Sequence, residues 1–189
     1  MMFSLSTPYL LIYLYIFAPK RLMMFNSNAK SVYVTDIHPL TVQNIQYNVE
    51  LNEKSPSFNP SKNRVFGQTI NWNDKSTWPK TEKVDYILGS DLIYQSSIVP
   101  YLTKVIRGLL TEEGSFFYVA PEGGRDGLSQ FIKEMKTDGF FQSVHETIAP
   151  PTYTTNPLKS QDEEDCFLHF HELASTTYVL YEFSRVKKE

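Results

Sequence analysis

From residue 31 onward, the apolar positions switch repeatedly between a strand pattern and a helix pattern. Short runs rich in β-branched and aromatic residues predict six strands, over residues 31–35, 64–70, 84–90, 115–121, 141–149 and 176–186. Between them, apolar residues recur every three or four positions, which predicts helices over residues 38–52, 96–110 and part of 124–140. Proline in the first turn of the first helix, Pro39, agrees with a helix start there.

This order of elements predicts an α/β fold. Alternating strands and helices are typical of a Rossmann-like, doubly wound and mostly parallel sheet. The run at 84–90 is apolar almost throughout, as expected for a strand covered on both faces. The last two strands have no helix between them, so they can pair only in antiparallel fashion. We therefore expect a mostly parallel sheet with an antiparallel C-terminal strand.

The N-terminal segment has a different composition. Residues 1–19 carry no charge, and a dense apolar run extends from Tyr9 to Ala18 before Lys20 and Arg21. A membrane anchor is one interpretation, because the length approaches the minimum for spanning a bilayer. A buried core segment or a mis-assigned start is the interpretation we favour, since an apolar run this short is more typical of a core. We divide the chain into an atypical segment, 1–24, and a main domain, 25–189.

Charge and cysteine content limit the classes of partner. The net charge of −3 over 189 residues gives no reason to expect nucleic acid as a ligand. Cys166 is the only cysteine, so the chain is compatible with a reducing compartment. We expect a monomer in the cytoplasm, with the nucleus as an alternative. His169 to Glu172 ("HFHE") comes nearest to a metal motif but lacks a third ligand, so we expect no metal.

Polar and aromatic residues follow the predicted strands where each strand ends. They are Asp36, then Asn71 and Trp72, then Ser90 and Asp91 with Tyr94 shortly after. Ligands of open α/β sheets bind at the carboxyl ends of the strands, so we expect these side chains to line one site. An acid at position 36 suits two ribose hydroxyls or a helix N-terminus. The Trp72 indole could lie against an adenine or form a hydrophobic lid over the end of the sheet. Asp91 and Tyr94 could contact a polar substrate or form the turn that leads into the next helix.

The strings "VYVTDIHPLTVQNIQYNVELN", "INW" and "VDYILGSDLIY" resemble the seven-β-strand S-adenosylmethionine-dependent methyltransferases of the protein-lysine type. The D-x-x-Y motif of that family is matched by Asp91 and Tyr94. The resemblance implies that Asp36 binds the cofactor ribose, that Asn71 and Trp72 lie against the adenine, and that Ser90 lies near the cofactor's centre. Asp91 and Tyr94 would line the position of the acceptor lysine. The implied partner is a protein substrate.

One part of the family pattern is missing. The glycine-rich E-x-G-x-G loop should precede the ribose acid by roughly 20 residues, yet no glycine occurs before Gly67. Residues with a Cβ cannot reproduce a glycine turn that closely approaches a ligand. We therefore expect an N-terminally incomplete fold and impaired cofactor binding. The alternatives are a non-catalytic binding module or truncated pseudo-enzyme on the same fold, or a small-molecule methyltransferase.

The only glycine cluster is "GGRDG" at 123–127, after the strand at 115–121. It lacks the Lys-Ser/Thr pair of a phosphate-binding loop. We predict a loop on the substrate side, with glycines that serve its turns.

Overall fold

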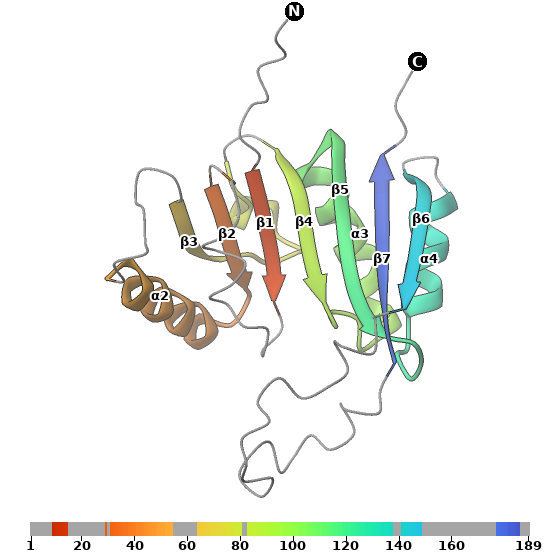
Figure 1. Ribbon diagram of the computed structural model, residues 1–189, viewed down its shortest axis with the longest axis horizontal. Helices are drawn as coiled ribbons and strands as arrows, with labels where there is room; N and C mark the ends of the chain where they lie inside the picture. The colour runs from red at the N-terminus through yellow and green to blue at the C-terminus, as the bar shows by residue number, and fades with distance from the viewer. Residues whose placement is uncertain are drawn as a thin grey trace, which may run out of the picture.

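The computed structural model describes residues 9–14, 29, 31–54, 64–80, 83–137, 141–148 and 177–185. Seven strands form one sheet in the order β3-β2-β1-β4-β5-β7-β6 (Figure 1). Along the chain the strands are β1 (Tyr9–Leu14), β2 (Ser31–Asp36), β3 (Arg64–Thr69), β4 (Val84–Ser90), β5 (Leu110–Pro121), β6 (Phe141–Ile148) and β7 (Tyr178–Arg185). The helices are α2 (Pro39–Glu53), α3 (Val99–Leu109) and α4 (Leu128–Thr137), with short 3-10 turns η1 (Lys75–Thr77) and η2 (Ser96–Ile98).

The predicted α/β class, a mostly parallel sheet with an antiparallel C-terminal strand, is confirmed. Strands β3, β2, β1, β4 and β5 pair in parallel, and β7 pairs antiparallel with both β5 and β6. The last strand thus enters the sheet between its two predecessors, which an antiparallel connection permits without a crossover helix. The carboxyl ends of the parallel strands lie together at one edge of the sheet, the lower edge in Figure 1.

The apolar N-terminal run contributes a central strand. β1 pairs with β2 on one side and with β4 on the other, so Tyr13 lies opposite both Thr35 and Gly89. This position agrees with a core segment, the interpretation favoured above for the apolar run. The domain boundary between residues 24 and 25 stays a prediction.

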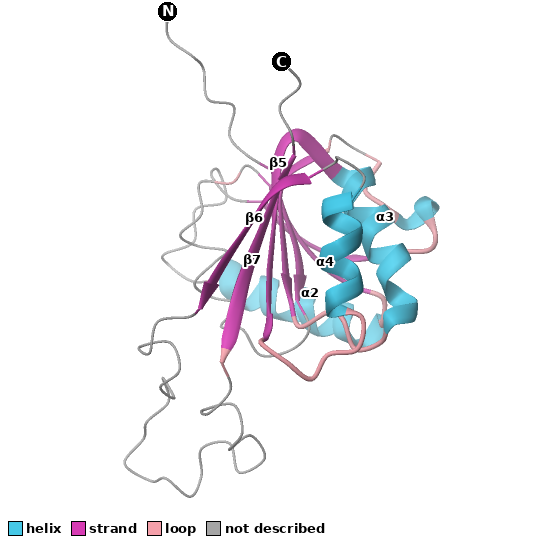
Figure 2. Cartoon of the chain, turned by 90° about the vertical axis from the view of Figure 1, so that its right-hand side faces the viewer, coloured by secondary structure: helices cyan, strands magenta, loops and turns pink. Residues whose placement is uncertain are grey.

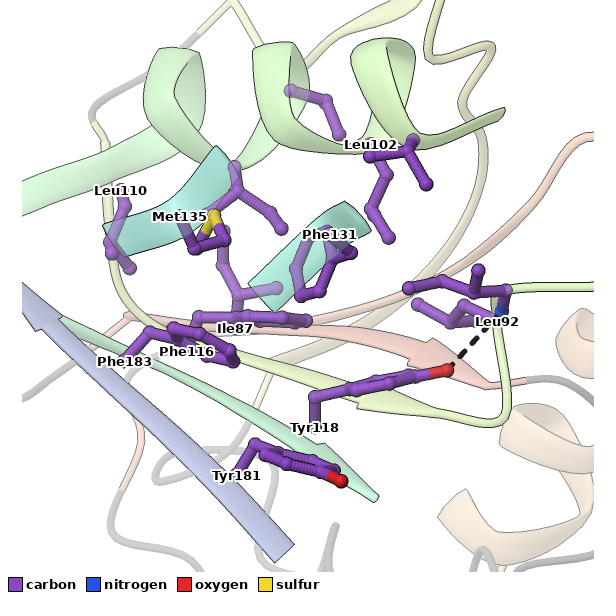
Figure 3. Packing of buried hydrophobic residues seen from close by; sticks show 14 of the residues in the cluster. Ile87, Leu92, Leu102, Leu110, Phe116, Tyr118, Phe131, Met135, Tyr181 and Phe183 are labelled. Carbon is purple, nitrogen blue, oxygen red and sulfur yellow. Dashed lines mark hydrogen bonds between the residues drawn. The ribbon is translucent and has the colours of Figure 1, made fainter. Parts of the chain in front are cut away.

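Among the described helices, α3 and α4 cover one face of the sheet, and α2 covers part of the other (Figure 2). α3 and α4 pack on the face that carries Ile87, Phe116 and Phe183, in the larger of two core clusters. Figure 3 shows Phe131 of α4 standing over these rings, and its ring centroid lies 5.4 Å from that of Phe183. Leu102, a member of the predicted apolar stripe of α3, is fully buried in the same cluster.

α2 buries its predicted stripe on the opposite face. Val42 and Ile45 are buried, and Ile45 and Val49 pack with Val32 and Val34 of β2. The helix begins directly after β2, with only residues 37 and 38 forming the turn between them. That turn places the N-terminus of α2 at the carboxyl edge of the sheet.

Two predictions about strands were wrong in detail. Tyr86 of β4 is 41% exposed, because α2 covers β2 and β3 and leaves this side of β4 open among the described residues. β5 begins at Leu110 and not at 115, directly after α3 ends at Leu109. Its pairing with β4 shifts register between Val84 and Tyr86, which accommodates the extra residues.

Several predictions fall on residues outside the described ranges. They concern residues 15–28, the acidic loop at 150–165, Cys166 and the His169–Glu172 motif. No helix in the described ranges has both the length and the apolar character required to cross a membrane.

Candidate functional site

A cavity of about 270 Å³ opens at the carboxyl edge of the sheet. The loops after β2, β3 and β4 and the start of α3 enclose it. The residues that line it are Thr35, Asp36, Ile37, Ile70, Asn71, Trp72, Asn73, Leu92, Tyr94, Ile98 and Tyr101. A cavity at this edge is where parallel α/β sheets bind ligands, because the strand ends and the turns that follow them converge there.

Asp36 forms one wall of the cavity at the end of β2. Its Oδ1 accepts the backbone N–H of His38 at 2.7 Å, and its carbonyl accepts the N–H of Ile70 at 3.1 Å. The first contact is an Asx turn that leads the chain into α2. Within the described residues, no hydrogen bond reaches Oδ2, and Asp36 lines the cavity. Both interpretations of the acid therefore agree with its geometry: it starts the helix and it lines a binding site.

The loop after β3 is held by its own hydrogen bonds. The backbone N–H of Asn71 donates to Thr77 Oγ1 at 2.9 Å, and the Asn71 carbonyl accepts the indole N–H of Trp78 at 2.9 Å. The Asn71 side chain accepts the backbone N–H of Asn73 at 3.0 Å. Trp78 is buried in the large core cluster, so the loop is fixed to the core at its far end. The cavity wall made by residues 71–73 is consequently preformed.

The walls of the cavity are largely apolar. Trp72 is half-buried, packs against the large core cluster and also faces the cavity, beside the buried Ile70 and Leu92. Tyr94 and Tyr101 are each 42% exposed and lie where the cavity meets solvent. An apolar pocket with a carboxylate at one end and phenols at its mouth suits a flat, partly polar ligand.

Asp91 and Tyr94 belong to a cluster beside the cavity. Arg125 donates from Nε to Asp91 Oδ1 at 2.6 Å and from Nη2 to Oδ2 at 2.5 Å, a bidentate ion pair. Tyr94 Oη donates to Asp91 Oδ2 at 3.3 Å, and the Arg125 guanidinium lies 4.8 Å from the Tyr94 ring centroid. The cluster joins the loop after β4 to the loop after β5.

The backbone at Asp91 is unusual, with a φ of +48°. A short polar residue is tolerated in this left-handed region, where a bulky one is strained. The Asp91 N–H donates to the carbonyl of Val119 at 2.8 Å, which anchors the turn to β5. The side chain is thereby directed out of the sheet toward Arg125.

The charges of this pair affect neighbouring groups. The hydrogen bonds that Arg125 donates to the Asp91 carboxylate raise the pKa of Arg125. Burial raises the pKa of the Tyr118 phenol, which accepts the Ile93 N–H at 3.3 Å beneath the turn (Figure 3). Burial also raises the pKa of Tyr178, and the nearby Asp91 carboxylate adds to that shift. The Arg125 guanidinium therefore stays charged at neutral pH, with the neutral phenols of Tyr118 and Tyr178 nearby.

The structure brings four of the six predicted site residues to one cavity: Asp36, Asn71, Trp72 and Tyr94. Ser90 and Asp91 lie at the end of β4 but outside the cavity wall. Sequence reasoning did not assign Arg125, although it placed the glycine cluster around it on the substrate side. The signal available in the sequence was a single arginine in the loop that follows a predicted strand. Tyr101 was also missed, because it lies in an apolar helix pattern.

Among the residues that the structure describes, no group of three or more His, Cys, Asp or Glu side chains is arranged to hold a metal ion. The cavity side chains are instead suited to an organic ligand.

The strand order, the antiparallel β7 and the cavity at the carboxyl edge define a Rossmann-like methyltransferase fold. The chain belongs to the lysine methyltransferase family, since the model of that family matches residues 21–138, more than half of the chain. It is an S-adenosylmethionine-dependent methyltransferase.

Solved structures share this fold at low identity. The N-methyltransferase NodS from Bradyrhizobium japonicum WM9, in complex with S-adenosyl-L-homocysteine, is similar with a TM-score of 0.58 at 10% identity; the match covers 96% of this chain and 80% of that chain. An rRNA methylase from Streptococcus thermophilus has a TM-score of 0.56 at 7% identity, with 96% and 89% coverage. The 1,6-didemethyltoxoflavin-N1-methyltransferase of Burkholderia thailandensis has a TM-score of 0.55 at 13% identity, with 96% and 72% coverage. The comparison with curated proteins found no match.

The cavity fits part of the cofactor. The Asp36 carboxylate suits the ribose, whose hydroxyls need a hydrogen-bond acceptor. The apolar wall around Trp72 suits the adenine, which needs a flat apolar surface. The other half of such a site would adjoin the end of β1, where residues 15–28 lie outside the described ranges.

Proposed function

We propose that this chain transfers a methyl group from S-adenosylmethionine to the side-chain amine of a protein lysine. One juxtaposition supports this proposal: Tyr94 lines the same cavity as Asp36 and Trp72 and also hydrogen-bonds Asp91. The nucleoside side and the acceptor side of a transfer site would thus meet at one side chain. The partly exposed mouth at Tyr94 and Tyr101 is open to a long side chain supplied by a macromolecule.

The cofactor supplies an electrophilic methyl group on a sulfonium. The residues of this chain supply position and proton control. Asp36 would hold the ribose and Asn71 and Trp72 the adenine, while Ser90 would lie near the cofactor's centre. A lysine amine has an ordinary pKa of about 10.4 and must be neutral to attack. Asp91 would orient the amine and attract its proton, and Tyr94 would align it through its phenol.

Calorimetry with S-adenosylhomocysteine tests the cofactor half of the proposal. We expect saturable binding to the intact chain, lost or weakened at least tenfold in Asp36→Ala and Trp72→Ala. Glu112→Gln, an exposed change on β5 outside the cavity wall, is the control and should bind as wild type does. Absence of binding to the wild type up to millimolar ligand would contradict the claim that this chain is itself a working enzyme.

Transfer from methyl-tritiated S-adenosylmethionine to a cell extract tests the acceptor. After acid hydrolysis, we expect the label in methylated lysine, and we expect Asp91→Asn to reduce it more than it reduces stability. Label found only in small metabolites would instead support a small-molecule acceptor. The cytoplasm, or the nucleus, is our proposed location, and imaging of the tagged full chain tests it.

A non-catalytic binding module is the second candidate. It is favoured by the absence of glycine before Gly67, because a cofactor's amino-acid end needs close backbone approach. A folded wild-type chain that fails to bind S-adenosylhomocysteine would support this candidate.

A further inference from the structure

Arg125 contacts the same groups of Asp91 and Tyr94 that the proposed reaction needs for its acceptor. Its fork uses both carboxylate oxygens of Asp91, at 2.6 and 2.5 Å, and its Cζ lies 4.8 Å from the centroid of the Tyr94 ring. A carboxylate offers about four lone-pair sites. Arg125 and Tyr94 occupy three of them, including both on Oδ2. Little acceptor capacity remains for another cation.

The loop that carries Arg125 is attached on both sides, with Gly123 and Gly124 between Arg125 and the first attachment. Before these glycines, the Glu122 backbone N–H donates to the Thr177 carbonyl at 2.9 Å. Asp126 Oδ2 accepts the Ser96 backbone N–H at 2.9 Å, and Gly127 packs so closely that an added Cβ would lie 2.7 Å from Ser96 Cα. Gly123 and Gly124 have no atom within 4 Å of an added Cβ, and Gly124 has a φ of +77°. Arg125 therefore sits between a fixed attachment to η2 and a glycine pair with free space around it.

The attraction between Arg125 and Asp91 is strong enough to form the ion pair but weak enough for another cation to displace the guanidinium. The Arg125 and Asp91 side chains are 28% and 25% exposed, so water screens their attraction. A bidentate fork adds geometric preference but does not remove that screening. The Arg125–Asp91 pair has no net charge, so it does not attract the ammonium group of an incoming lysine. The ammonium is attracted to the Asp91 carboxylate only when the guanidinium moves away from it.

We propose that Arg125 is a specificity-determining residue that occupies the acceptor position and competes with the substrate amine for Asp91. An acceptor lysine must displace the guanidinium from the carboxylate before its amine can align. Acceptors that cannot do so, such as isolated amines, are discriminated against, whereas a lysine held by further contacts with its own protein is accepted. This inference rests on the proposed function, because it assigns Asp91 and Tyr94 to the acceptor amine.

The test measures binding of a cationic amine probe, Nα-acetyl-L-lysine N-methylamide, by NMR titration of the labelled full chain. The titration is run with and without saturating S-adenosylhomocysteine. Arg125→Gln removes the competitor while keeping a polar side chain, and Arg125→Lys keeps the charge but loses the bidentate fork. Lys133→Gln, an exposed change on α4, is the charge-matched control. Chemical denaturation of each variant separates an effect on binding from an effect on folding.

We expect Arg125→Gln to bind the probe about fivefold more tightly than wild type, the scale of a partly exposed ion pair. Arg125→Lys should fall between the two, and Lys133→Gln should match wild type. The gain should disappear in the double variant Arg125→Gln/Asp91→Asn, because the freed carboxylate is its source. It should also diminish at high salt.

Unchanged or weaker probe binding in a folded Arg125→Gln would overturn the proposal and make Arg125 a residue that merely holds Asp91 in place. A gain in probe binding that persists without the Asp91 carboxylate would overturn it as well. A wild type that binds no S-adenosylhomocysteine defeats the proposed function instead. The titration without cofactor then still reports whether Arg125 competes for Asp91.

Discussion

Three glycines around Arg125 differ in a way that separates backbone strain from steric contact. Gly127 has a φ of +91°, and an added Cβ would lie 2.7 Å from Ser96 Cα and 3.0 Å from Ser96 N. Gly124 has a φ of +77° with no atom within 4 Å of an added Cβ, and Gly123 has the same free space without a positive φ. Replacement by alanine therefore adds backbone strain and a steric clash at Gly127, backbone strain alone at Gly124, and neither at Gly123.

The expected costs follow from these geometries. Gly124→Ala forces an alanine into the left-handed region, which costs roughly 1–2 kcal/mol. Gly127→Ala adds a methyl group against backbone atoms that cannot rotate away, an overpacking cost of roughly 1–3 kcal/mol, for a total of about 2–5 kcal/mol. Gly123→Ala should lie within about 1 kcal/mol of wild type, because alanine mainly restricts the unfolded chain there.

Urea denaturation followed by tryptophan fluorescence gives the free energies of unfolding. Trp78 is 8% exposed in the folded state, so its emission should change on unfolding. Equal m-values among the variants are required before the midpoints are compared. The reasoning is refuted if Gly127→Ala is no less stable than Gly124→Ala, since the close approach to Ser96 would then be absent.

Two further predictions test the core and the loop anchor. Phe131→Ala should lower the free energy of unfolding by about 3–5 kcal/mol in urea denaturation, because Phe131 is fully buried among Phe116, Tyr118 and Phe183. The control Lys133→Ala, at an exposed position, should be nearly neutral. A loss below about 1 kcal/mol for Phe131→Ala would contradict this packing. The backbone N–H of Ser96 lowers the pKa of Asp126 below its ordinary 3.8. The Asp126 carboxylate therefore stabilises the fold above about pH 4, and that contribution is lost as the pH falls through the pKa of the folded state. Asp126→Asn should be less stable than wild type at pH 7, with a difference in urea midpoint that shrinks toward pH 3; a pH-independent difference would refute the assignment.

Much of the candidate site was accessible to sequence reasoning. Asp36 and Trp72 follow predicted strands, and the rule that ligands bind at carboxyl strand ends brings such residues together. Ser90 and Asp91 also stand at a strand end, yet they lie outside the cavity wall, because the left-handed turn at Asp91 directs its side chain toward Arg125. A turn of that kind depends on the contact with Val119, which no local pattern reveals.

By itself, the sequence determined the existence and type of the regular elements from residue 31 onward and the apolar stripes of α2, α3 and α4. Periodicity is a local property, so neighbouring residues suffice to predict which side of a helix is buried. Because the sequence shows no helix pattern before the last strand, it likewise predicted the antiparallel pairing of that strand, since a parallel one needs a long crossover.

Only the tertiary structure decided what the run at Tyr9–Leu14 does. The length of this apolar run favours a core segment, but its role as a strand depends on whether β2 and β4 leave a gap for it. The same holds for Arg125, which meets Asp91 across 34 residues of chain. Such contacts depend on which strands are neighbours in the sheet, and strand order is a property of the whole packed molecule.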